Sequence, residues 1–221
     1  KTDALITLLD DEDVVVRRRA FQSLAMGPPI TDAALLERLA ALFEGDRNDR
    51  ESDILRNDAG KALARAGALA TAHLLPLLDD RRMQLQAVAD LGETGVVDGN
   101  VVARLREMIC DETLSAGVRE QAVRAVGKLR AKSTVPELLE VLKIKQRNLE
   151  YLRGAAVLAL GKIGDSRAVD PLVEHLDARY STVVVYWIER ALDEALRSLT
   201  GVKGVVGRQE WRAWAKQREV R

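Results

Sequence analysis

The sequence has few of the residues on which most binding and catalytic sites depend. Its 221 residues include one cysteine and two histidines, and aromatic residues make up only 4% of the chain. The single cysteine, Cys110, excludes an intrachain disulfide, and because it follows two apolar residues we predict a buried, inert thiol. The histidines, His73 and His175, lie far apart, and no cysteine or histidine stands at metal-ligand spacing. We therefore predict no metal site.

Motifs of known catalytic chemistry are also missing. The segment Gly92–Gly95 lacks the lysine and the preceding strand of a phosphate-binding loop. No serine lies in the sharp strand-to-helix turn motif of a nucleophilic hydrolase. The sequence thus predicts no catalytic residue, no cofactor and a protein that is not an enzyme.

The charged residues balance overall but not along the chain. Formal net charge is zero, yet residues 1–110 carry 14 Lys/Arg against 19 Asp/Glu, and residues 111–221 carry 20 against 15. No apolar run approaches the length needed to cross a bilayer, so we expect no membrane span. The chain starts at Lys1, without Met and inside a helical pattern, so we expect a trimmed or processed form whose targeting segment is missing. The compartment stays open, with the cytoplasm favoured.

An alanine-centred block recurs along the chain. An aliphatic residue is followed by Arg and then, three residues later, by Ala, as in the segment Val118–Ala122. The alanine anchors are 39, 28, 35 and 34 residues apart, and a set of Leu and Val residues four positions later repeats these intervals. The anchors are Ala20, Ala59, Ala87, Ala122 and Ala156, and the second set is Leu24, Leu63, Leu91, Val126 and Leu160. Periods in this range indicate stacked helix pairs.

The repeat pattern predicts an all-α fold, an alpha–alpha superhelix of about five full helix-pair repeats with partial units at both ends. We expect a single domain over residues 1–221, with a partial repeat at 1–13, five repeats at 14–178 and capping helices at 179–221. Within it, the polar segment 46–53 is expected to be an exposed loop between the first and second repeats.

One family resemblance follows from these repeats. The segment Leu152–Leu176, with its Arg153-Gly154-Ala155-Ala156 start and its Gly161-Lys162-Ile163-Gly164-Asp165 turn, resembles the bacterial HEAT-like repeat, also called the phycobilisome-lyase type. The likeness covers most of residues 10–178 and is strongest in the fourth and fifth repeats. It implies a HEAT-like solenoid. A second likeness lies at Leu199-Thr200-Gly201 followed by Trp211 and Trp214, which is similar to the C-terminal segment of many bacterial HEAT-repeat proteins and implies a capping helix.

Two sets of charged residues occupy equivalent repeat positions. The first is the arginine ladder, Arg17, Arg56, Arg119 and Arg153, which we interpret as structural ties between neighbouring repeats. The second is the acidic ladder on the second helices, Glu107, Glu140 and Glu174, beside which run Met108, Val141 and His175. Because second helices usually line the partner-binding face of such arrays, we predict that this surface binds a basic or amphipathic peptide.

Three functions remain open at this point. The first is a non-catalytic scaffold that binds a partner protein or peptide along the concave face. The alternative, implied by the repeat subtype, is a bilin-lyase-like chromophore-handling or chaperone protein that works with a partner subunit and a tetrapyrrole. The lowest-ranked is a relative of the HEAT-like alkylpurine glycosylases. Nucleic acid is not expected as a partner, because the ladder is acidic and the net charge is zero.

Overall fold

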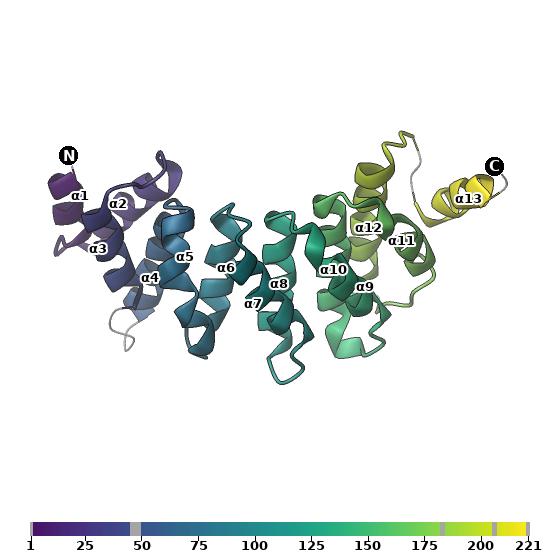
Figure 1. Ribbon diagram of the computed structural model, residues 1–221, viewed down its shortest axis with the longest axis horizontal. Helices are drawn as coiled ribbons and strands as arrows, with labels where there is room; N and C mark the ends of the chain where they lie inside the picture. Colours follow the sequence, from purple (N-terminus) through teal and green to yellow (C-terminus); the bar gives the residue numbers. More distant parts are fainter. Residues whose placement is uncertain (1, 45–49, 182–183, 205–206, 220–221) are drawn as a thin grey trace. The chain divides into compact units, whose positions relative to one another are not determined.

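The computed structural model describes residues 2–44, 50–181, 184–204 and 207–219, and Figure 1 shows the order of their helices along the chain. These residues form thirteen α-helices, four short 3₁₀ helices and no strand, which confirms the predicted all-α solenoid class. The α-helices are α1 (Thr2–Leu9), α2 (Val14–Met26), α3 (Ala33–Glu44), α4 (Arg50–Ala64), α5 (Ala68–Leu74), α6 (Gln84–Glu93), α7 (Gly99–Cys110), α8 (Ala116–Lys128), α9 (Val135–Lys143), α10 (Glu150–Ile163), α11 (Val169–His175), α12 (Val185–Thr200) and α13 (Arg208–Glu219). The 3₁₀ helices are η1 (Pro76–Asp79), η2 (Lys132–Thr134), η3 (Arg147–Leu149) and η4 (Ser166–Ala168).

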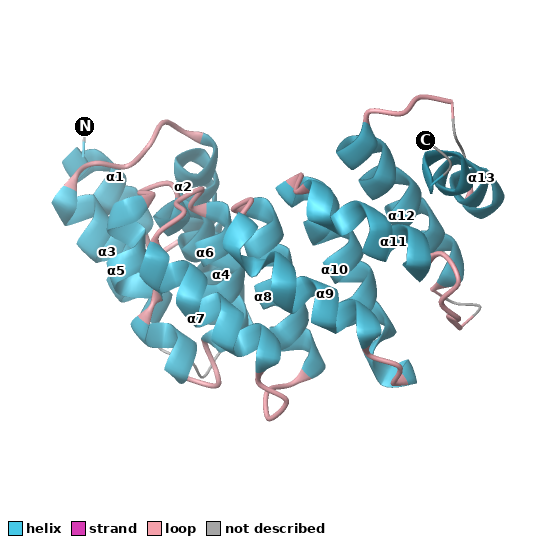
Figure 2. Ribbon diagram, turned by 45° about the vertical axis from the view of Figure 1, so that its right-hand side comes forward, coloured by secondary structure: helices cyan, strands magenta, loops and turns pink. Residues whose placement is uncertain are grey.

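The chain forms two compact units, an N-terminal unit over Lys1–Val101 and a C-terminal unit over Val102–Arg221. In the N-terminal unit α2 packs against α4, and α4 packs against α6. In the C-terminal unit α8 packs against α10, and α10 packs against α12. The α2–α4, α4–α6 and α8–α10 contacts join the first helices of successive repeats, and the α10–α12 contact joins the fifth repeat to the helix that follows it. Figure 2 shows the described helices and loops.

The repeat alanines lie in the core, where they let neighbouring helices approach closely. Ala59, Ala87, Ala122 and Ala156 have no exposed surface, and Ala20 is 6% exposed. The Leu and Val residues four positions later are also buried, because residues four apart lie on the same face of a helix. The period read from the sequence is therefore the period of the core.

Glycine occupies a repeat position where two helix backbones nearly touch. A Cβ added to Gly161 on α10 would lie 2.7 Å from the Cα of Ala195 on α12. One added to Gly127 on α8 would lie 2.8 Å from the Cα of Ala159 on α10. Since the nearest atoms belong to the backbone, no side-chain movement could make room, and the close packing of these first helices requires glycine.

Helix boundaries follow local chemistry. The side chain of Asp13 accepts a hydrogen bond from the Val15 N–H at the start of α2, and Ser115 caps α8 through the Val118 N–H. Gly164 and Gly201, both with positive φ, end α10 and α12 in the left-handed conformation that glycine tolerates. Pro76, which has no N–H to donate, begins η1 directly after α5, so the second helix of that repeat is divided.

The predicted loop over 46–53 is partly wrong. Residues 50–53 belong to α4, which begins at Arg50, and residues 46–49 lie outside the described part of the chain. The polar run contains no proline or glycine, so it is compatible with a helix. Its polarity alone does not distinguish a turn of helix from a loop.

Candidate functional site

A groove of about 800 Å³ lies between the second helices of the last two repeats in the C-terminal unit. One wall comes from α9 and the segment that follows it, and the other from α11 and residues 178–179. Apolar side chains along both walls include Val135, Pro136, Leu139, Ile144, Pro171 and Ala178. Its volume is in the range of small-molecule sites, and apolar walls with a few polar groups are typical of such sites.

The charged side chains of the groove are mostly cations. Lys143, Lys145, Arg153, Arg167 and Arg179 line it, against Glu140 and Glu174. Three of the cations have a carboxylate partner, because Lys143 pairs with Glu140 at 2.7 Å, Arg167 with Asp165 at 2.7 Å and Arg153 with Glu150 at 3.8 Å. Lys145 and Arg179 remain, against the single carboxylate of Glu174. The groove therefore favours a ligand that is largely apolar and carries negative charge.

Arg153 contributes a buried guanidinium to the groove. Its side chain is 6% exposed, and one Nη donates to the Ile144 carbonyl at 2.8 Å. The other Nη lies 3.8 Å from buried Glu150, and the guanidinium stacks on the Tyr180 ring at 4.6 Å. Glu150 in turn accepts hydrogen bonds from the Ser181 N–H at 3.0 Å and the Ser181 hydroxyl at 2.5 Å. These contacts hold α10 to the segment after α11.

His175 and Tyr180 form a hydrogen-bonded pair at the same place. Burial, together with the nearby positive charge of Arg153, lowers the pKa of His175 to about 4. Burial also raises the pKa of Tyr180 to about 12. At neutral pH the tyrosine hydroxyl is therefore protonated and the imidazole of His175 is neutral, so one of these two uncharged groups donates the hydrogen bond to the other.

This pair predicts a pH dependence. An unfolded chain protonates His175 near pH 6.5, whereas the folded chain keeps it neutral down to about pH 4. The unfolded state therefore binds more protons within this window, so stability falls as the pH decreases. From pH 7 to pH 5 we expect the C-terminal unit to lose about 2 kcal/mol of unfolding free energy from this group.

Urea unfolding at pH 7 and pH 5 tests this pH dependence. Tryptophan fluorescence reports on the C-terminal unit, because all three tryptophans lie in it. The His175→Gln variant lacks the titrating group and should show a smaller loss between the two pH values. Equal losses in the two proteins would contradict the burial of a neutral His175.

The residues of the acidic ladder do not all lie at the groove. Glu140 and Glu174 line the groove, and Glu107 does not. Glu107 pairs with Arg104 at 2.9 Å within its own helix, just as Glu140 pairs with Lys143. Their role in partner binding stays a prediction.

The residues beside the acidic ladder face inward. Met108 and Val141 are 2% and 3% exposed, so their side chains belong to the core and offer no surface to a partner. His175, 8% exposed, is the one residue of this row that lines the groove.

Residues of the arginine ladder bind backbone carbonyls that precede them in the chain. Arg17 donates to the carbonyls of Asp11 and Glu12, Arg119 to that of Ile109 at 3.0 Å, and Arg153 to that of Ile144. In the C-terminal unit these carbonyls lie at the ends of α7 and α9. Arg56 is half-buried on α4. The bonds of Arg119 and Arg153 connect the end of one repeat to the first helix of the next. The role of the whole ladder as structural ties stays a prediction.

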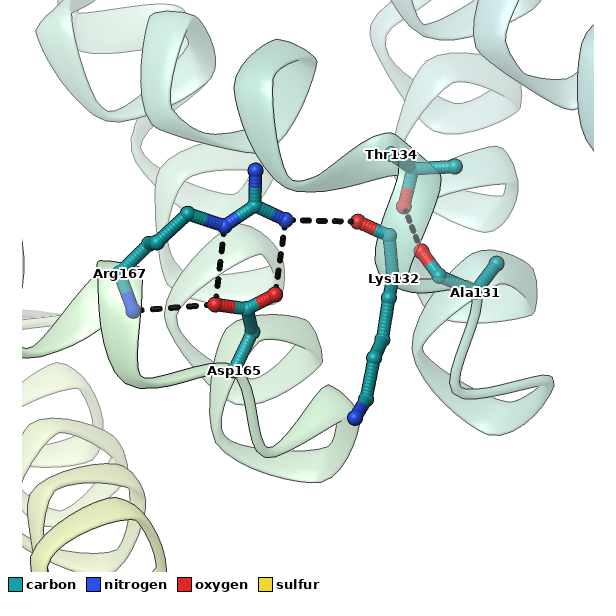
Figure 3. Close-up of polar contacts among 5 residues, drawn as sticks. All are labelled: Ala131, Lys132, Thr134, Asp165 and Arg167. Carbon is teal, nitrogen blue, oxygen red and sulfur yellow. Dashed lines mark hydrogen bonds and ion pairs between the residues drawn. The ribbon is translucent and has the colours of Figure 1, made fainter.

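A second connection between repeats involves the turns before α9 and α11. Arg167 holds Asp165 with its backbone N–H and its guanidinium, and the same guanidinium reaches the Lys132 carbonyl of the preceding repeat at 3.4 Å (Figure 3). The Arg167 contacts lower the pKa of Asp165 to about 2, so the carboxylate stays charged. In the preceding repeat, the Thr134 hydroxyl donates to the Ala131 carbonyl at 2.7 Å.

The two C-terminal tryptophans lie on α13. Trp211 has no exposed surface, and its indole Nε1 donates to Asp193 of α12 at 2.8 Å. Trp214 packs edge-to-face on Trp211. The basic side chains of α13 pair with acidic residues of neighbouring elements: Arg208 with Glu189, Arg212 with Asp177, and Arg218 with Asp170. A capping role for this helix, as the sequence resemblance implies, stays a proposal.

Cys110 is exposed at the end of α7, so its predicted burial is wrong. The apolar residues before it, Met108 and Ile109, point into the core, and the helix turns the next position outward. Partial removal of water and the charge of Glu137 raise the pKa of the thiol, which keeps it in its less reactive protonated form.

Sequence reasoning missed the cationic residues of the groove. Lys145 and Arg179 are 34 residues apart and follow the ends of equivalent second helices. That interval equals the spacing of the last two alanine anchors, so the repeat alignment contained the signal. No repeat spacing indicates that Tyr180 and Glu150 lie at the groove, because their contacts depend on the path of the chain after α11.

Comparison with known proteins finds a matching repeat family and a sequence relative. Residues 111–193 match the family model of HEAT repeats. A stretch of 106 residues is 38% identical to the bilin biosynthesis protein PecE of Mastigocladus laminosus and covers 46% of this chain and 38% of that protein. The chain therefore spans well under half the length of this relative.

One solved structure shows the same fold at low identity. An engineered protein from the Northeast Structural Genomics Consortium is 17% identical with a TM-score of 0.50, and the match covers 90% of this chain and 96% of that one. The complex of CpcE and CpcF of phycocyanin lyase from Nostoc sp. PCC7120 is also similar, at 20% identity and a TM-score of 0.48, covering 100% of this chain and 95% of that chain. Across the described ranges, no helix has both the length and the apolar character that a bilayer crossing requires.

These comparisons correct one prediction. The expectation that the protein is not an enzyme is contradicted by the similarity to a bilin biosynthesis protein, which points to an enzyme-related function. The expectation failed because it relied on contiguous motifs, whereas the groove collects its polar residues from several helices of successive repeats. The resemblance to HEAT-like repeats, in contrast, is confirmed by the family match and by the stacked helix pairs. Residues 111–193 of the chain therefore form HEAT repeats.

Proposed function

We propose that this protein handles a bilin, and that the groove between α9 and α11 holds the chromophore. The observation that carries the proposal is the combination of apolar walls and surplus cations in a groove of about 800 Å³. A bilin is an open-chain tetrapyrrole with a conjugated, largely apolar body and two propionate groups. Its body would bury apolar surface against the walls, and its carboxylates would meet the cations.

The similarity to PecE supports the same ligand class from an independent direction, since that protein is named for bilin biosynthesis. We infer that the chain acts in the attachment or transfer of a bilin rather than as an inert scaffold. The chemical contribution of the groove would be to bind the chromophore and hold it in one orientation, which lowers the entropic cost of a later reaction step.

A protein partner belongs to this proposal. Attachment of a bilin involves two molecules, the chromophore and the protein that receives it, so a protein of this function must bind both. Stacked helix pairs present extended surfaces that suit protein binding. The partner and the bilin would then meet at the same face of the C-terminal unit.

Filling the groove tests the proposal. Leu139 on α9 is half-buried and lines the groove, so in Leu139→Trp the larger ring would occupy space that the bilin needs. Titration of biliverdin, followed by its absorbance, should give a dissociation constant at least about tenfold higher than for the native protein, a loss of at least 1.4 kcal/mol in binding. Leu158→Trp, at an equally half-buried helical position on α10 outside the groove, should bind as the native protein does.

Circular dichroism would verify that both variants keep their helical content. Equal binding of biliverdin by the Leu139 and Leu158 variants would place any bilin elsewhere. An unchanged biliverdin spectrum with the native protein would contradict the proposed function itself.

A further inference from the structure

The cations of the groove are unequally distributed between its two ends. Lys145 and Arg179 follow the C-terminal ends of α9 and α11, and Arg153 lies at the same end through its bond to the Ile144 carbonyl. We call these three residues the cationic end. The remaining two cations, Lys143 and Arg167, have carboxylate partners of their own at 2.7 Å.

Lys145 and Arg179 keep their charge available for a ligand. Both are exposed, and neither forms an ion pair with any residue in the described ranges. The C-terminal ends of helices attract cations to some degree by themselves, with a contribution of at most about 1 kcal/mol at exposed positions. That attraction explains why cations are tolerated here, but it leaves their hydrogen-bond donors unused.

Arg153 has a buried hydrogen-bond donor that no acceptor satisfies. Its Nε–H is buried and has no hydrogen-bond partner, although the side chain lines the groove. The nearest carboxylate, Glu150, stands 3.8 Å away and is occupied by two hydrogen bonds from Ser181. A buried donor without an acceptor costs free energy, and a guanidinium is suited to a planar, two-oxygen acceptor.

We propose that the cationic end binds a carboxylate group of the ligand in the groove. This inference rests on the proposed function and deepens it: the carboxylate is a propionate of the bilin, and it fixes the direction in which the chromophore lies between α9 and α11. The apolar body then extends along Leu139 and Pro171. His175, neutral and held by Tyr180, adds no charge at this end at neutral pH.

Esterification of the ligand separates the carboxylate contribution from that of the apolar body. Biliverdin and biliverdin dimethyl ester share the conjugated body, but the ester has no negative charge. We expect the native protein to bind biliverdin at least about tenfold more tightly than its dimethyl ester, because charge-assisted hydrogen bonds are the stronger ones. Absorbance titration of both compounds measures this ratio.

Two double variants test whether the cationic end causes the difference in affinity between biliverdin and its dimethyl ester. Lys145→Gln/Arg179→Gln removes the two exposed cations of the cationic end and should weaken biliverdin about tenfold, with the ester unaffected. Lys132→Gln/Lys162→Gln makes the same change of charge at exposed positions outside the groove, and it should leave both affinities unchanged. Arg153 is left in place because its bond to Ile144 also supports the fold.

The outcomes distinguish the carboxylate site from the proposed function. If the native protein binds the acid and the ester equally, or if the control variant loses as much affinity for biliverdin as the Lys145/Arg179 variant, the carboxylate site is refuted and bilin binding stands. If neither compound binds the native protein, the proposed function fails and the carboxylate site fails with it.

Discussion

Replacement of Trp211 by alanine is expected to release α13 from the C-terminal unit. The indole has no exposed surface, and it donates a hydrogen bond to Asp193 at 2.8 Å. Loss of a buried tryptophan costs about 3–5 kcal/mol, because the transfer of the ring from water and the packing around it are both lost. The ion pairs of the arginines on α13 are too weak to compensate, because these side chains are 30–47% exposed and pairs open to solvent contribute at most about 1 kcal/mol each.

Hydrogen exchange measured by mass spectrometry tests this prediction. In Trp211→Ala, the amides of residues 208–219 should exchange much faster than in the native protein, whereas those of the N-terminal unit should be unaffected. Trp214→Ala, at a half-buried position on the same helix, is the control and should have a smaller effect. Unchanged protection of α13 in the Trp211 variant would show that the helix is held by other contacts.

The second large effect is expected at Gly161, where the backbones of α10 and α12 lie close together. A leucine there would place its Cβ 2.7 Å from the Cα of Ala195, so the two helices must separate. We expect a loss of about 3 kcal/mol in unfolding free energy, since overpacking of a core costs about 1–3 kcal/mol and here the obstacle is backbone. The gain in helix propensity on replacing glycine, about 1 kcal/mol, offsets only part of it.

Urea unfolding measured by tryptophan fluorescence reports on the same unit. Gly117→Leu is the matched control, because this glycine is exposed on α8 and an added Cβ would meet only the Ser115 hydroxyl at 4.0 Å. That variant should be as stable as the native protein or slightly more so. A Gly161 variant as stable as the Gly117 variant would mean that the close approach of α10 and α12 is not needed for stability.

The fold could be predicted from the sequence because each repeat places the same kinds of residue at the same positions of its first helix. Alanine at one position and Leu or Val four residues later must both face a neighbouring helix, so their intervals record the helix-pair period directly. Residues 50–53 show the limit of such reasoning, since a polar run without proline or glycine is compatible with both a loop and an exposed turn of helix.

The binding groove could be predicted only in part. Glu140, Glu174 and His175 line the groove, and Glu140 and Glu174 occupy equivalent positions on second helices. Their role in binding a partner stays a prediction. Met108 on α7 and Val141 on α9 directly follow Glu107 and Glu140 but point into the core, because the side-chain direction changes by about 100° per residue. The surplus of cations was missed because Lys145 and Arg179 lie beyond the ends of the helices, where helical periodicity gives no information.

Arg153 has a structural role in the arginine ladder and a proposed role in ligand binding. In the arginine ladder it has the same carbonyl-binding task as Arg119, and the pattern alone explains both. Of these two arginines, Arg153 has Tyr180 and Glu150 beside it and lines the groove between α9 and α11. These neighbours come from the last repeat and the segment after it, so they depend on the tertiary structure.

The most direct test of this account is to locate a bound bilin by methyl NMR of the full chain. With leucine, isoleucine and valine methyl groups labelled, addition of biliverdin should shift the signals of Leu139, Ile144 and Val135, which line the groove. The signals of Leu24 and Leu63, in the core of the N-terminal unit, should stay in place. Shifts confined to methyl groups outside the groove would contradict the central claim that the bilin lies between α9 and α11.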